Sequence, residues 1–190
     1  QVFDTKDAGS GKTLTASGLT IKDENNVDVT SNYSISYVSN TTGVISQKSL
    51  TAATTVASKV YDGSPAAGAV TLGTVTGLVG TETLVITATA SDYANANVGT
   101  GKETTISYAL ADGTNGGLAS NYSMATFATT GDITPLAVTV TAVTDTKVYD
   151  GTTSSSASPT VGPLATGDAV LTAPVQVFDT KDAGSGKTLT

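Results

Sequence analysis

The sequence contains no cysteine, histidine, tryptophan or arginine, so all nine of its basic residues are lysines. Without cysteine or histidine, the chain has no thiolate nucleophile, no imidazole base and no soft metal ligand. Without arginine it lacks the bidentate group that clamps phosphates and carboxylates. We therefore expect no catalytic residue, no cofactor-binding residue, no bound cofactor and no metal ligand, and we expect the protein not to be an enzyme.

Positive charge is also scarce over the 190 residues, and the formal net charge is −7 at pH 7. An acidic chain repels nucleic acid and anionic membrane surfaces. No apolar run approaches the roughly 20 residues of a membrane-spanning helix. Nucleic acid is therefore not an expected partner, and we expect no insertion into a membrane. The lack of cysteine carries no evidence about the redox compartment.

Threonine is abundant, with 37 residues, whereas aromatic residues make up only 5% of the chain. Side chains branched at Cβ fit the pleated surface of a sheet and lose rotamer freedom in a helix. No window shows a convincing helical stripe of ten or more residues. These features predict an all-β protein.

Two repeats organise the chain. The block QVFDTKDAGSGKTLT occupies residues 1–15 and returns at residues 176–190, which sets a period of 175 residues. Within it, the run Lys59–Gly63 recurs as Lys147–Gly151, 88 positions later. The chain thus alternates two related units of about 88 residues, as tandem repeats do.

The phasing of these units predicts the domain boundaries. We expect residues 47–134 to be one complete unit, residues 1–46 the second half of a preceding unit, and residues 135–190 the first half of the next, as in a fragment of a longer array. The expected partners are neighbouring repeats of the same chain. Incomplete end units could also associate head to tail with another molecule.

Short strands separated by turns predict an Ig-like β-sandwich in each repeat. A β-grasp-like, mostly-β unit with a short helix is the alternative. Residues Leu136–Ala142 alternate between apolar and polar faces, and the dipeptide Asp-Gly after Lys-Val-Tyr predicts a tight hairpin turn that needs positive φ. Further strands are expected at 12–21, 33–38, 83–90, 103–110, 122–128 and 169–178.

Five short motifs, taken from different repeat units, have the same order within a unit as in a known family. They are Lys147–Gly151, Gly167-Asp168, Asn97–Lys102, Asn121-Tyr122 and Gly131–Pro135. The chain resembles the YDG-type repeat domain of bacterial surface proteins over almost its whole length. The ending Gly43–Gln47 departs from the pattern because it has no proline.

The resemblance implies a location and a role. Such repeats are similar to the spacer arrays of very large secreted adhesins of Gram-negative bacteria, which are filamentous-haemagglutinin-like proteins exported by an outer-membrane partner. It implies an extracellular, cell-surface stalk that carries a binding tip in cell adhesion or biofilm formation. A glycan- or matrix-binding module is the runner-up.

The run Gly9–Thr13, Gly-Ser-Gly-Lys-Thr, has the ending of a phosphate-binding loop. A true phosphate loop needs a glycine at position 6, where Lys6 stands, and a helix after the lysine. The residues that follow alternate like a strand. We interpret the stretch as a turn that leads into a strand, with Lys12 as a solvated loop charge.

Three other candidates are weighed against ordinary structural roles. The oxygen-rich run Lys22–Asp28 suggests calcium, but it lacks the spacing of a helical calcium loop and suits a solvated turn. Tyr61 and Tyr149 could stack on sugars, yet they suit structural roles beside a turn. An isopeptide bond between Lys147 and the Asn32 of a rejoined repeat unit would need a buried acid, which the sequence does not identify.

Overall fold

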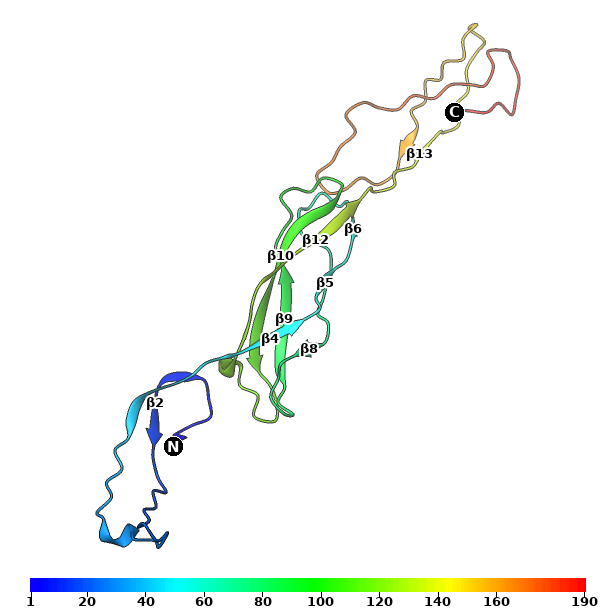
Figure 1. Ribbon diagram of the computed structural model, residues 1–190. Coiled ribbons are helices and arrows are strands. Elements are labelled where there is room, and N and C mark those ends of the chain that lie inside the picture. The colour runs from blue at the N-terminus through cyan, green and yellow to red at the C-terminus, as the bar shows by residue number, and fades with distance from the viewer. The chain divides into compact units, whose positions relative to one another are not determined.

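The computed structural model describes residues 1–190. It is built of short strands and two single-turn 3-10 helices, η1 (Thr30–Asn32) and η2 (Ala119–Asn121) (Figure 1). The strands are β1 (Val2–Phe3), β2 (Gly9–Thr15), β3 (Asn40–Ile45), β4 (Lys48–Ala52), β5 (Thr55–Val56), β6 (Lys59–Val60), β7 (Val70–Thr71), β8 (Val75–Thr76), β9 (Leu84–Ala90), β10 (Gly99–Asp112), β11 (Tyr122–Met124), β12 (Phe127–Thr134), β13 (Val140–Thr141) and β14 (Thr160–Val161). The expected all-β class is confirmed. The structure has no helix with the length and apolar character needed to cross a bilayer.

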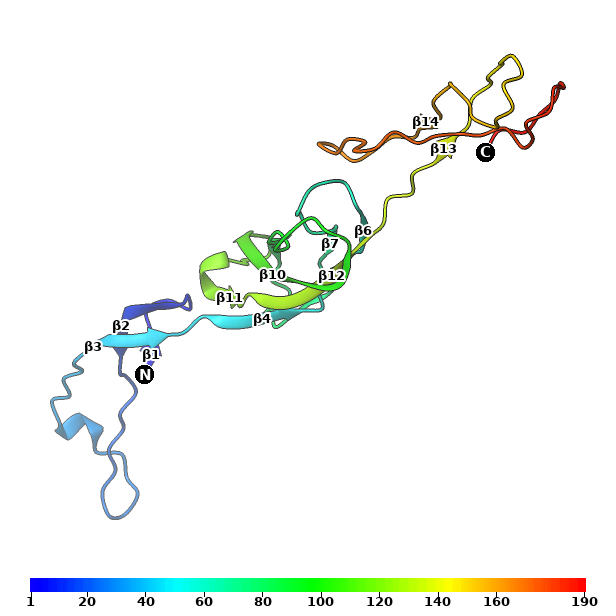
Figure 2. The same cartoon turned by 90° about the horizontal axis from the view of Figure 1, so that it is seen from above.

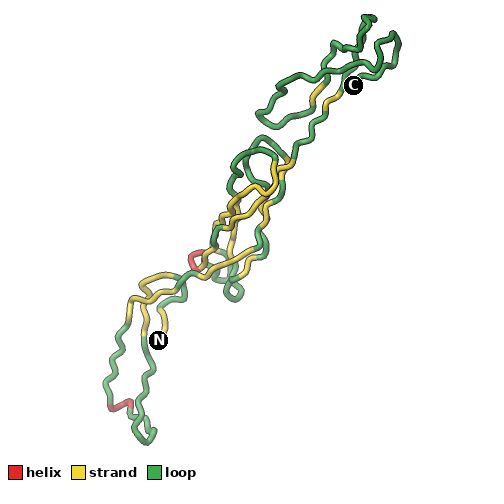
Figure 3. The backbone as a smooth tube through the Cα atoms, turned by 45° about the horizontal axis from the view of Figure 1, so that its top comes forward, coloured by secondary structure: helices red, strands yellow, loops and turns green.

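The strands form five small sheets, drawn in yellow in Figure 3. Their orders are β1-β2-β3, β6-β12-β10-β9, β11-β4-β8, β13-β14 and β5-β7. The chain divides into two compact units. Unit 1 comprises residues 1–55, 70–89 and 105–127, and unit 2 comprises residues 56–69, 90–104 and 128–190.

Unit 1 is centred on the parallel pair β4 and β11, which lie side by side in Figure 2, with Met124 opposite Leu50. Leu50 and Tyr122 are buried, and Ile106 of β10 is fully buried. In β9 the burial alternates residue by residue, as expected where a threonine-rich face meets water. The predicted strands at 83–90 and 103–110 are confirmed by β9 and β10.

Unit 2 contains the parallel pair β6 and β12, in which Ile133 lies opposite Lys59. Ile133 is 1% exposed and Tyr93 is 3% exposed, so both belong to the core. A Cβ atom built on Gly131 would lie 2.1 Å from the hydroxyl oxygen of Tyr93. A glycine is needed here because the tyrosine ring fills the space beside β12.

The identical segments 1–15 and 176–190 form the same local pairing. Phe3 lies opposite Leu14 in the first, and Phe178 lies opposite Leu189 in the second. Local sequence therefore determines this antiparallel turn wherever it occurs.

Other predicted strands are wrong or shortened. Residues 33–38 and 169–178 form no strand, apart from isolated bridges at Val177 and Phe178. The strand predicted at 12–21 ends at Thr15, the one at 136–142 is reduced to β13, and the one at 122–128 is split between β11 and the start of β12.

Missing partners explain these differences. The first residues of segment 47–134, in strand β4, pair with both β11 and β8. Their counterpart around β13 pairs only with β14, which corresponds to β8. Alternating side chains make a segment suitable for a strand, but a strand forms only where another segment takes its backbone hydrogen bonds.

Candidate functional site: loops at the joints between repeats

The loop Lys-Val-Tyr-Asp-Gly is built around its aspartate. In the first copy, Nζ of Lys59 donates to Oδ1 of Asp62 and to the carbonyl oxygen of Ser64, both at 2.8 Å. In the second, Nζ of Lys147 donates to Asp150 at 2.9 Å and to the carbonyl oxygen of Thr152 at 2.8 Å. Each aspartate also accepts the backbone N–H two residues later.

The glycines of these loops have the positive φ predicted for them, 81° at Gly63 and 78° at Gly151. The prediction of a hairpin is wrong, however. The strand before the first loop, β6, pairs in parallel with β12 instead of with the strand that follows the loop. The lysine and the aspartate close the turn, and the strand takes a distant partner.

Electrostatics supports this role for the aspartate. The Lys147 ammonium, aided by hydrogen bonds from Thr152, lowers the pKa of Asp150 from 3.8 to about 2. Lys59 and the Ser64 amide likewise lower the pKa of Asp62. These bonds hold Nζ of Lys147 within its own loop.

A polar joint connects residues 1–46 with residues 47–134 inside unit 1. The side chain of Asn121 donates to Oδ1 of Asp7 at 2.9 Å, and its oxygen accepts the N–H of Ala8 at 2.7 Å. Nζ of Lys6 lies 3.4 Å from Oε1 of Glu82. The Asn121 side chain thus binds both the side chain of Asp7 and the backbone of Ala8.

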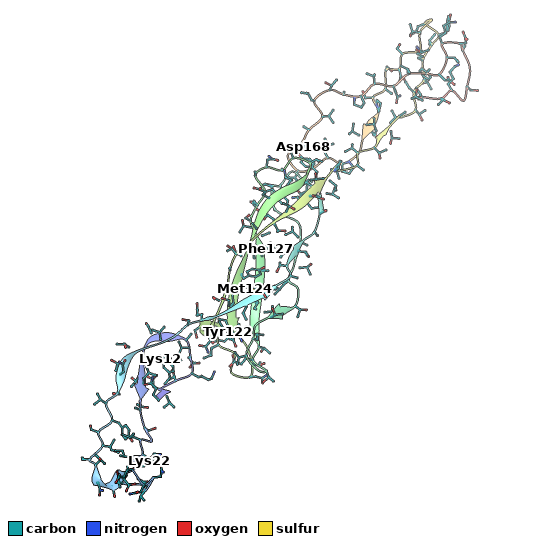
Figure 4. All side chains as sticks on the ribbon, in the orientation of Figure 1. Lys12, Lys22, Tyr122, Met124, Phe127 and Asp168 are labelled. Atoms are coloured by element: carbon teal, nitrogen blue, oxygen red, sulfur yellow. The ribbon has the colours of Figure 1, made fainter.

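Tyr122, labelled in Figure 4, fixes the carboxylate of this joint. Its hydroxyl donates to Oε2 of Glu82 at 2.6 Å and accepts the N–H of Val79 at 3.1 Å. The hydrogen bond between Tyr122 and Glu82 lowers the pKa of Glu82 and raises that of Tyr122. The hydrogen bond from Asn121 lowers the pKa of Asp7. The Asn-Tyr motif is therefore a contact element of the joint.

A second joint connects residues 47–134 with residues 135–190 inside unit 2. A hydrogen bond between Tyr61 and Asp168, the latter labelled in Figure 4, raises the pKa of Tyr61. The backbone of Thr166 lies close to Gly63. A Cβ atom built on Gly63 would lie 2.6 Å from the carbonyl oxygen of Thr166. The contacted residues lie just before β9 at 80–83 and just before the segment 169–178, which forms no strand, at 165–168.

The Gly-Ser-Gly-Lys stretch begins strand β2 and makes no phosphate loop. Its lysine is not merely a solvated charge, which corrects the sequence-based interpretation. Nζ of Lys12 donates to the hydroxyl of Thr5, and Lys187 makes the same contact with Thr180. In the related stretch, Nζ of Lys102 lies 2.9 Å from Oδ1 of Asn95 and 5.9 Å from the centre of the Tyr93 ring.

The acidic run Lys22–Asp28 uses its oxygens for its own turn. Oδ1 of Asp23 accepts the N–H groups of Asn25 and Val27, each at 2.9 Å. Oδ1 of Asp28 accepts the N–H of Thr30 at 2.8 Å, and these bonds with Thr30 lower the pKa of Asp28. Lys22, labelled in Figure 4, donates to Asn26. The oxygens proposed as calcium ligands serve the backbone of an Asx-type turn.

The two candidate sugar-stacking tyrosines differ. Tyr61 is half-buried in its joint, whereas Tyr149 is exposed. Tyr149 lines a cavity of about 700 Å³ in unit 2, together with Phe178, Lys147 and the residues Gly184–Lys187. Nζ of Lys147 lies 5.7 Å from the centre of the Phe178 ring.

Sequence reasoning missed two polar groups near this cavity. The buried side chain of Gln176 accepts the N–H of Val143 and donates to its carbonyl oxygen, both at 2.8 Å. Asp145 accepts hydrogen bonds from Ser155 and the following residues, which lower its pKa to about 2. No local pattern marks these residues, since their partners lie 10 to 33 positions away.

Small sheets, two Lys-Val-Tyr-Asp-Gly loops and two polar joints define an all-β protein of tandem repeats. The family model of the YDG domain matches residues 46–130 and again residues 134–190. The chain therefore belongs to the YDG domain family. No curated protein and no solved structure matches it.

Proposed function

We propose that the chain is a structural spacer: a series of β repeats in the stalk of a secreted bacterial surface adhesin, outside the cell, without catalytic activity. The observation that carries this proposal is the pair of joints. At each one, side chains of one repeat contact the loop at 80–83 or 165–168 of the next. Contacts at successive boundaries stiffen a tandem array locally, which is what a spacer requires.

The composition supports the same role. A net charge of −7 and a low content of aromatic residues reduce sticking between identical neighbours. The polar groups described above are used for turns and joints: Lys59 and Lys147 close loops, and Glu82 and Asn121 hold a joint. A spacer needs these structural contacts and no reactive group.

The test is a replacement experiment in the adhesin that carries these repeats. Deletion of several repeats should reduce adhesion of whole cells while the purified tip binds its receptor normally. An unrelated β domain of similar length, inserted in their place, should restore adhesion because only the reach matters. Failure of the unrelated domain to restore adhesion would show that the repeats bind something themselves.

The runner-up is a glycan-binding module, favoured by one observation: the cavity beside exposed Tyr149 also contains Phe178. Aromatic faces are common sugar platforms. Binding to a glycan array that is lost in Tyr149→Ala, with Tyr61→Ala as the half-buried comparison, would support this function over the spacer.

A further inference from the structure

We infer that Ser155 and Gln176 form a covalent ester cross-link within unit 2, with Asp145 as the base that activates the serine. The site consists of a hydroxyl, a carboxylate and a buried side-chain amide, which lie in one chain of hydrogen bonds. It is separate from the Lys-Val-Tyr-Asp-Gly loops and from the two joints. The inference adds a self-reaction to the protein and does not depend on the spacer role.

The backbone places Ser155 opposite Gln176. Ser154 and Val177 form an antiparallel bridge, so the next pair in the same register is Ser155 with Gln176. Side chains of successive pairs point to opposite faces. Ser154 and Val177 are exposed, whereas Ser155 is half-buried and Gln176 is 2% exposed. Residues opposite each other in such a pair have Cβ atoms about 5 Å apart, close enough for their side chains to react.

The amide of Gln176 is held in one orientation. Its Oε1 accepts the N–H of Val143, and its Nε2 donates to the carbonyl oxygen of Val143, both at 2.8 Å. These two bonds identify the oxygen end of the amide and direct the nitrogen towards Ser155, whose Oγ lies 3.0 Å from Nε2. The N–H of Val143 is also placed to stabilise the negative charge that develops on Oε1 when a nucleophile adds to Cδ.

The hydroxyl of Ser155 has a carboxylate as its acceptor. It donates to Oδ2 of Asp145 at 2.6 Å, and the N–H groups of Ser156 and Ala157 hold the same oxygen at 2.8 and 3.3 Å. A hydroxyl bonded to a base and lying beside an amide has the arrangement of an activated nucleophile. The bond from Ser155, together with these N–H bonds, lowers the pKa of Asp145 to about 2. The carboxylate is therefore ionised at neutral pH but weakly basic, and we expect a slow reaction that takes place once in each chain.

The reaction is balanced by these three side chains. Oγ of Ser155 moves from the amide nitrogen to the face of Cδ and forms the C–O bond, while its proton passes to Oδ2 of Asp145. The C–N bond of Gln176 then breaks, and the nitrogen takes this proton and leaves as ammonia. The products are an ester, one ammonia and the carboxylate in its original ionised form. Proximity replaces a bimolecular encounter, and the burial of Gln176 keeps water away from the ester.

The other repeat does not carry this site. The position 88 residues before Asp145 is Ala57, and the counterpart of Gln176 in the segment that contains Tyr93 is Ser91. The cross-link is therefore expected in one of the two alternating unit types. It would join positions 21 residues apart, so that tension on the chain could not extend the loop between them.

Digestion of the full chain and mass spectrometry test the bond. Cleavage before each aspartate separates residues 150–167, which contain Ser155, from residues 168–178, which contain Gln176. After incubation at neutral pH we expect the two peptides to remain joined, with a mass equal to their sum minus one ammonia. Mild alkali should hydrolyse the ester and release both peptides. Two separate peptides before alkali, or a joined peptide that resists it, would overturn the proposal.

Matched variants test the roles of the groups. Ser155→Ala removes the nucleophile and should give no joined peptide. Asp145→Asn removes the base and should slow the joining by roughly 100-fold or more. The control Ser156→Ala removes a neighbouring hydroxyl that lies 3.5 Å from the same carboxylate, and it should join at the original rate. Equal yields of the joined peptide from Ser155→Ala and Ser156→Ala would refute the assignment of the nucleophile.

Discussion

Residues 47–134 and 135–190 carry the same motifs but are held together differently. In the first segment, strand ladders enclose Ile133 and Tyr93, which are almost fully buried. In the second, only β13 and β14 pair as strands, and side chains such as Gln176 and Asp145 bind the backbone instead. Leu171, the counterpart of half-buried Ile86, is 99% exposed. The same motifs therefore form strand ladders only where another segment supplies backbone partners.

The largest effect is expected from the core of residues 47–134. Ile133→Ala should reduce the free energy of unfolding by about 2–5 kcal/mol, because it leaves a cavity under β12. Its counterpart Ile45 is only half-buried, so Ile45→Ala should cost about 1 kcal/mol or less. Urea unfolding followed by tyrosine fluorescence measures both. Equal losses would show that burial does not distinguish the two isoleucines.

Gln176 tests how the second segment is held. Gln176→Ala removes hydrogen bonds to Val143 and to Ser155, and we expect a loss of about 1–3 kcal/mol in local stability. Hydrogen exchange of the amide of Val143 reports it. Gln1→Ala is the matched control, because Gln1 has the same sequence context but is exposed. A similar effect of both substitutions would show that the sequence context of the glutamine, and not its burial, determines the local stability.

Substitution of Tyr93 should raise the free energy of unfolding instead of lowering it. Its buried hydroxyl has no hydrogen-bond partner, and phenylalanine stands at the corresponding positions 3 and 178. Tyr93→Phe is expected to raise the free energy of unfolding by about 1 kcal/mol. Tyr108→Phe removes a bond to Thr54 and should lower it by about 0.5–1.5 kcal/mol. Thermal or urea unfolding of both variants checks the signs, and a loss in Tyr93→Phe would contradict the assignment.

The smallest effect is a local dependence on pH in the second segment. The pKa of Asp145 is lowered from 3.8 to about 2, so its carboxylate stabilises the folded loop fully above pH 4. That contribution is lost as the pH falls from about 4 to about 2. Hydrogen exchange at Ser156 and Ala157 should accelerate in this window, and Asp145→Asn should remove the dependence. An unchanged profile in Asp145→Asn would assign it to other carboxylates, such as Asp150.

Local features were predictable because a few neighbouring residues decide them. The positive φ of Gly63 and Gly151 follows from the Asp-Gly dipeptide, and β9 follows from alternation. The joint residues Lys6, Glu82 and Asn121 were not identified as such. Their bonded partners lie 76 to 114 positions away along the chain, so no local pattern marks them. Only the repetition of the Asn-Tyr motif pointed to one of them, Asn121.

The sequence alone determined the all-β class, the period of 175 residues, the glycine turns and the resemblance to YDG repeats. The tertiary structure decided which alternating segments became strands, the parallel pairing of β6 with β12, and the burial of Tyr93 beside Gly131. The reason is physical. A turn is stabilised by bonds among adjacent residues, whereas a strand depends on backbone partners that only the folded chain brings to its edge.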